Sequence, residues 1–164
     1  MTAKACISSA SRISTSIKEL GVSAERLNSV SDELAKAIRP IDAALKKLNL
    51  GVAAWYQYAR SSNSEDSEYW SRHIGYAKVG HKWGLALSMA SGPEGPEGPE
   101  EEEWLFSDAP RWMRVEAVDH IPDLLEHLVE RANEVAESLQ KQTDHAREFA
   151  GLISALTATS EGKG

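Results

Sequence analysis

Residues 13–48 read ISTSIKELGVSAERLNSVSDELAKAIRPIDAALKKL, and their apolar side chains recur at alternating steps of four and three residues. An average period of 3.5 residues is typical of helices that bury one continuous stripe, here called the seam, against a partner helix. We therefore predict a helical arm over residues 1–50. Its seam positions are Ile13, Ile17, Leu20, Ala24, Leu27, Ser31, Leu34, Ile38, Ile41, Leu45 and Leu48.

The same spacing returns over residues 121–156, which read IPDLLEHLVERANEVAESLQKQTDHAREFAGLISAL. The seam positions of this second arm, predicted over residues 121–158, are Ile121, Leu125, Leu128, Ala132, Val135, Leu139, Gln142, Ala146, Phe149, Ile153 and Leu156. Two arms of equal length predict an antiparallel helical hairpin. The register in which facing residue numbers add up to 173 places Ser31 opposite Gln142 and each alanine opposite a large side chain, which satisfies the polar groups and evens the packing.

Charge and the positions beside the seam indicate how the arms associate. Residues 1–50 carry eight basic and five acidic residues (+3), whereas residues 121–164 carry four and eight (−4), so unlike arms attract. The positions beside the seam are largely apolar, although a two-stranded coil usually has Glu and Lys there. We therefore predict a homodimer that forms a four-helix bundle, or binding to another protein's helix. The predicted interface residues are Val30, Ala37, Ala44, Leu124, Val129 and Ala136.

Residues 51–120 have the pattern of a β-rich head. Aromatic residues and turn signals predict antiparallel strands at 51–60, 69–79 and 81–90, and a short fourth strand at 103–106. Three Gly-Pro-Glu triplets predict a flexible acidic loop over residues 91–103, and residues 159–164 are expected to form a disordered tail.

These elements together predict an α+β fold in a single domain over residues 1–164. Its long antiparallel coiled-coil hairpin carries, inserted between the arms, a small antiparallel sheet of three to four strands. The third strand is expected to place Trp83, Leu85, Leu87 and Met89 on the core face.

Composition narrows the possible functions. The chain has 164 residues, a formal net charge of −7 and one cysteine, which makes nucleic acid an unlikely partner and a cytoplasmic location the expected one. We find no membrane-spanning apolar run and no signal peptide, and the five histidines form no metal-binding motif. No nucleotide-binding or catalytic motif is found either. We therefore predict no cofactor, no metal and no enzymatic activity.

The second predicted strand carries the pattern closest to a ligand-binding surface. Aromatic and basic residues alternate on one of its faces, as in proteins that bind single-stranded nucleic acid. The alternatives are that the aromatic side chains form the core face of the sheet, with the basic side chains reaching solvent, or that they bind a protein partner. The candidate binding residues are Trp70, Arg72, Tyr76, Lys78, Lys82, Arg111 and Arg114.

The sequence therefore predicts a non-enzymatic interaction or assembly module that self-associates through its helical arms. The alternative function is binding of single-stranded nucleic acid or a small ligand through the aromatic and basic strand of the head.

Overall fold

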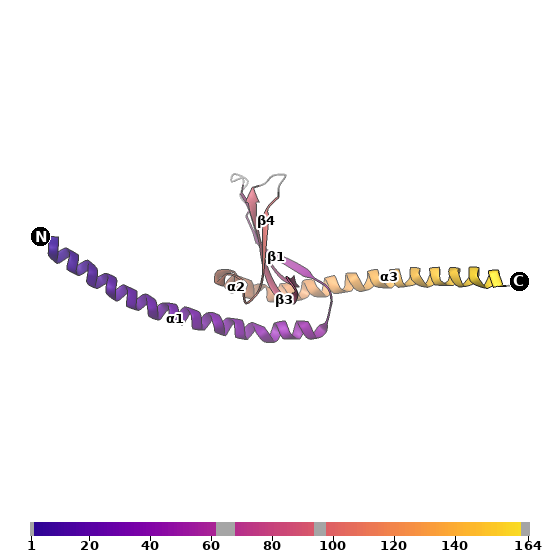
Figure 1. The fold of residues 1–164 in the computed structure, drawn as a ribbon, viewed down its shortest axis with the longest axis horizontal. Coiled ribbons are helices and arrows are strands. Elements are labelled where there is room, and N and C mark those ends of the chain that lie inside the picture. The colour runs from indigo at the N-terminus through magenta and orange to yellow at the C-terminus, as the bar shows by residue number, and fades with distance from the viewer. Residues whose placement is uncertain (1, 62–67, 94–97, 162–164) are drawn as a thin grey trace. The chain divides into compact units, whose positions relative to one another are not determined.

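A computed structural model describes residues 2–61, 68–93 and 98–161 (Figure 1). The chain divides into two compact units, Met1–Lys47 and Leu48–Gly164. The first unit holds the N-terminal helix, and the second holds the sheet and the remaining helices.

The first unit is one long helix, α1, which spans Thr2–Leu48 and confirms the predicted N-terminal arm. The helix runs through Pro40, and Figure 1 shows it as a gently curved rod. Its end has a clear cause: Asn49 has a φ of 49°, and asparagine is one of the few residues that favour this left-handed conformation after a helix. Lys46 and Lys47 lie in the last turn, where positive charge is favourable.

The second unit is built on a four-stranded antiparallel sheet with the order β1-β2-β3-β4. Its strands are β1 (Ala54–Arg60), β2 (Glu68–Val79), β3 (Lys82–Pro93) and β4 (Glu100–Leu105). Val79 pairs with Lys82 across the two-residue turn at Gly80, whose φ of 61° suits glycine. The predicted α+β class, with its two long helices and antiparallel sheet, is confirmed.

The acidic segment between β3 and β4 differs from its prediction. Strand β3 reaches Pro93 and β4 begins at Glu100, so strands occupy both ends of the stretch predicted as a loop over 91–103; residues 94–97 lie outside the described residues. The glutamates fit a strand because β4 is an edge strand and Glu100–Glu103 are exposed, and charge protects such an edge from unwanted pairing.

Three consecutive helical segments complete the chain: α2 (Arg111–Ala117), η1 (Val118–His120) and α3 (Ile121–Glu161). Proline has no backbone N–H, so Pro122 cannot donate to the carbonyl of Val118, and its ring crowds that carbonyl. Ile121 instead donates its N–H to the Val118 oxygen, which gives the tighter turn of η1. Helix α3 confirms the predicted second arm and continues through residues 159–161 of the predicted tail.

Helices α2 and α3 pack a ridge of apolar side chains against one face of the sheet. Helix α3 contacts β1 and β2, and α2 contacts β3. The buried residues of the ridge are Met113, Ala117, Ile121, Leu124 and Leu128. The sheet contributes Ile74, Leu85 and Leu87, each at most 2 % exposed, and Trp83 and Met89 at the ends of the same face are half-buried.

In the first turns of α3 the predicted seam residues Ile121 and Leu128 are buried, and the prediction is wrong at one position. Leu124 is fully buried, whereas the predicted seam residue Leu125 is 37 % exposed. The reason is that these turns pack on the sheet, and a 3.5-residue period does not reveal whether a helix or a sheet covers the stripe. The antiparallel pairing of the two arms, with Ser31 opposite Gln142, and the single-domain interpretation both stay predictions.

Two adjacent leucines test this packing. We expect Leu124→Ala to lower the free energy of unfolding by about 2–5 kcal/mol, because it leaves a cavity under the ridge. Leu125→Ala makes the same chemical change one residue along, at an exposed position, and should cost less than about 1.5 kcal/mol. Urea denaturation of both variants measures the difference, and equal losses would contradict the packing.

Candidate functional site

Arg72 is the centre of a polar and aromatic cluster on the helix-covered face of the sheet. Its guanidinium carbon lies 4.5 Å from the ring centre of Trp70 and 4.6 Å from that of Trp112. Its Nη1 donates to Oε2 of Glu116 over 2.7 Å. We call Trp70, Arg72, Trp112 and Glu116 the tryptophan–arginine cluster; it joins β2 to α2.

The cluster follows from local geometry. Trp70 and Arg72 are two residues apart on β2, so their side chains leave the same face of the strand. Trp112 and Glu116 are four residues apart on α2 and therefore lie on one side of that helix. Both pairs meet where α2 lies on this face of the sheet, and the guanidinium lies over both indole rings.

Tyr58 lies beside the cluster. The register of β1 against β2 shifts between Gln57 and Ala59, and Tyr58 falls at this irregularity. Its ring stacks on His120 with centres 4.9 Å apart and an angle of 17° between the rings. Burial, reinforced by Glu116 and opposed by Arg72, raises the pKa of Tyr58 to about 12. The Tyr58 hydroxyl has no hydrogen-bond partner within the part of the chain that the structure describes.

The seven residues predicted to bind a ligand fall into different environments. Trp70 and Arg72 come together in the cluster, whereas Tyr76 is buried, 3 % exposed, and contacts Trp83. Lys78, Lys82 and Arg111 are exposed, and Arg114 is half-buried. Since Tyr76 is covered and Arg72 is already engaged, this arrangement favours the interpretation of the strand as a core face over base stacking.

Sequence reasoning missed Trp112 and Glu116. Their spacing of four residues was visible in the sequence, but only the fold shows that α2 lies within reach of the Arg72 side chain. Trp112 remains 44 % exposed, so the cluster presents an aromatic side chain at the surface while its charged groups neutralise each other.

The opposite face of the sheet brings another polar set together. His73 pairs with Ser88 across the β2–β3 ladder, and the Ser88 hydroxyl donates to Oε1 of Glu101 over 2.9 Å. Burial lowers the pKa of His73, and the nearby Glu101 opposes this shift. The Ser88 hydroxyl donates to the Glu101 carboxylate and not to the His73 imidazole. Because the imidazole does not accept the serine proton, we interpret this set as a structural contact. The absence of enzymatic activity stays a prediction.

The largest exposed apolar surfaces lie on the two long helices. Every residue of α1 from Ser9 to Val30 is exposed, and so is every residue of α3 from Ala136 to Ala158. The large apolar residues among them are 54–72 % exposed. They are Ile13, Ile17, Leu20, Val22, Leu27 and Val30 on α1, and Leu139, Phe149, Leu152, Ile153 and Leu156 on α3.

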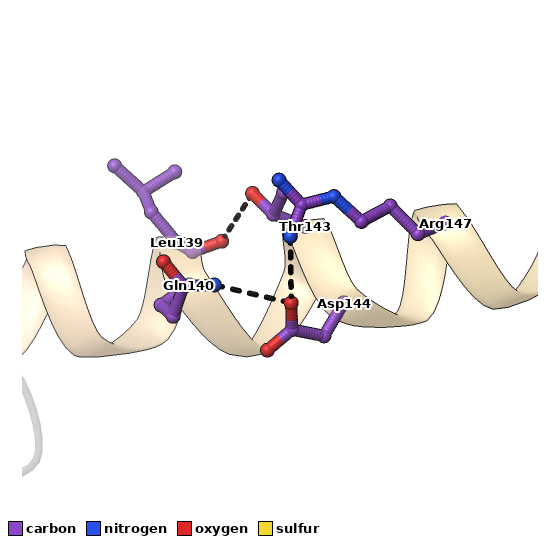
Figure 2. A network of polar contacts seen from close by, with 5 residues as sticks. All are labelled: Leu139, Gln140, Thr143, Asp144 and Arg147. Atoms are coloured by element: carbon purple, nitrogen blue, oxygen red, sulfur yellow. Dashed lines mark hydrogen bonds and ion pairs between the residues drawn. The ribbon is translucent and has the colours of Figure 1, made fainter.

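Polar side chains of α3 form hydrogen bonds with neighbours on the same helix (Figure 2). Asp144 accepts hydrogen bonds from Gln140 and from Arg147, each over 3.1 Å. The Thr143 hydroxyl donates to the Leu139 carbonyl over 2.8 Å. These contacts are local, as expected for side chains three and four residues apart, and they leave the apolar stripe as the distinctive surface of this helix.

The predicted interface residues can now be placed. Val30, Ala37, Ala44, Val129 and Ala136 are exposed. Leu124 is fully buried and therefore belongs to the core of the second unit, because its side chain has no surface to offer a partner.

Comparison with models of protein families, with curated proteins and with solved structures found no match to this chain. Within residues 2–61, 68–93 and 98–161, no helix combines the length and hydropathy that are needed to span a lipid bilayer.

Two cations on β2 test the cluster. We expect Arg72→Ala to lower the free energy of unfolding by about 1–2 kcal/mol, because it removes two cation–π contacts and one partly exposed ion pair. Lys78→Ala removes an exposed cation from the same strand and should change stability by less than about 0.5 kcal/mol. Urea denaturation compares the variants, and an Arg72→Ala cost no larger than that of Lys78→Ala would contradict a stabilising cluster.

Because the pKa of Tyr58 is raised in the folded state, we expect the protein to lose stability at high pH. Its folded-state pKa of about 12 lies above the ordinary value of 10.0 for tyrosine, so the folded state holds the phenolic proton more tightly than the unfolded state. The resulting stabilisation is complete below pH 10 and is lost as pH rises toward 12. We expect Tyr58→Phe to flatten the decline in unfolding free energy over this range, measured by urea denaturation at several pH values. An unchanged slope would contradict the shift.

Proposed function

We propose that this chain is a non-enzymatic assembly module that self-associates through its helical arms. The observation that carries the proposal is the stripe of large apolar side chains on α3, at positions 139, 149, 152, 153 and 156, which are 58–72 % exposed. Exposed large apolar side chains that gather in this way are typical of interaction sites in proteins.

The exposed part of α3 needs a partner for physical reasons. Residues 136–158 make a rod of about 35 Å at 1.5 Å per residue. Isolated helices are only weakly stable in water, and in proteins most helical stability comes from packing of an apolar face and not from intrinsic propensity. The heptad spacing of this face is the spacing that another helix covers best.

Several features support a second copy as the partner. The two arms carry opposite net charges, +3 and −4, so copies of this chain provide complementary helices. Exposed apolar residues also lie beside the seam, among them Val30 and Val129, and a single helix does not cover so wide a stripe. A homodimer with a four-helix bundle meets both conditions. The lone cysteine supports the prediction that this assembly is cytoplasmic.

Charge placed in the stripe tests the proposal. The wild-type chain should sediment at equilibrium above its monomer mass of 17.9 kDa. Ile153→Glu should raise the dissociation constant at least about tenfold, because about 1.4 kcal/mol or more is lost when a carboxylate is buried in the interface.

The matched control is Ser154→Glu, which adds the same charge one residue along and outside the seam. Its dissociation constant should stay within about threefold of wild type, a difference below about 1 kcal/mol. A wild-type chain that remains monomeric at high concentration would refute the proposed function.

A further inference from the structure

Helix α3 consists of two segments that differ in the contacts that hold them. In residues 121–135, here called the anchored segment, the ridge residues are buried against the sheet, and Ala132 and Val135 are half-buried. In residues 136–158, here called the outer segment, every residue is exposed. The helix is therefore continuous in its backbone but not in its tertiary contacts, and tertiary packing supplies most of the stability of a helix in a protein.

The outer segment contains a glycine for which the structure shows no need. Gly151 lies inside the helix and is not among the glycines with a positive φ, and a Cβ added there would have open space around it. Glycine has the largest conformational freedom to lose when a helix forms. In place of alanine it makes the helix about fivefold less favourable, so Gly151 weakens the outer segment.

Hydroxyl side chains weaken the outer segment further. Thr143 donates to the carbonyl of Leu139 and Ser154 donates to the carbonyl of Ala150, both over 2.8 Å. Bonds of this kind to the helix's own carbonyls slightly destabilise a helix, and serine and threonine favour helix less than alanine does. The sequence of the outer segment therefore does little to replace the tertiary contacts that the anchored segment has.

We infer that α3 unfolds in two separate steps: the outer segment loses its helical order while the anchored segment stays folded on the sheet. Local openings of this kind have free energies set by the contacts that they break. No residue of the outer segment is buried, so its opening exposes none of the ridge. The inference concerns α3 alone and holds for any helix that covers its stripe. The outer segment is thus an order–disorder element whose helix content responds to that cover.

Hydrogen exchange of the full chain tests the inference. Mass spectrometry compares the backbone amides of residues 125–135 with those of residues 136–158, after correction for intrinsic exchange rates, at two protein concentrations about a hundredfold apart. At the lower concentration we expect the outer amides to exchange at least about tenfold faster than the anchored amides. Equal protection of the two segments at this concentration would overturn the inference.

A mild core variant distinguishes two separate steps from one cooperative helix. Ile74 on β2 is completely buried, and Ile74→Val should speed exchange of residues 125–135 by about two- to tenfold. Exchange of residues 136–158 should not change, because their opening breaks no contact of Ile74. Equal acceleration of both segments would show that α3 unfolds as one unit, and the inference would fail.

A second variant acts on the outer segment itself. Gly151→Ala should slow exchange of residues 136–158 by about fivefold, because alanine favours the helix and fits the open space at this position. Unchanged exchange of these residues would contradict an opening that unfolds the helix around Gly151.

Exchange and sedimentation separate this inference from the proposed function. Fast exchange of the outer segment in a chain that sediments as a monomer would support the inference and refute the proposed function. In a chain that associates, protection of the outer segment should also rise with concentration, because binding stabilises the state that binds.

Discussion

Packing of a helical ridge on one face of the sheet is the interaction on which the second unit depends. Ile74, Leu85 and Leu87 are almost completely covered, and burial of each such side chain contributes about 1.5–3 kcal/mol. The ridge runs from Met113 in α2 to Leu128 in α3, across the tighter turn that Pro122 imposes. Without the ridge, these apolar side chains of the sheet would be exposed to water, so the helical cover is the main source of burial for the head.

The tryptophan–arginine cluster is a consequence of that packing. Once α2 lies against the sheet, Trp112 and Glu116 reach the strand that carries Trp70 and Arg72. The guanidinium is neutralised by one carboxylate and stacked by two indoles, so the most basic part of this face is used inside the fold. Burial raises the pKa of the neighbouring Tyr58; Glu116 of the cluster adds to this shift and Arg72 opposes it.

The long helices have a different energetic character. The first turns of α3 are stabilised by the sheet, but from Ala136 onward its side chains are exposed. Local contacts such as those of Asp144 with Gln140 and Arg147 are worth only a few tenths of a kcal/mol each. They cannot replace the burial of an apolar stripe, and this imbalance is the physical basis for expecting assembly.

The sequence by itself determined the elements. The 3.5-residue period over residues 13–48 and 121–156, the aromatic strands and the turn at Gly80 are local patterns, and periodicity and turn chemistry are properties of short segments. Only the tertiary structure decided what covers the stripe in the first turns of α3. It placed Leu124, and not Leu125, in the core because a sheet meets the first turns of α3. It also joined Arg72 to Trp112 and Glu116, about 40 residues away, since such contacts depend on how helices cross strands and leave no period in the chain.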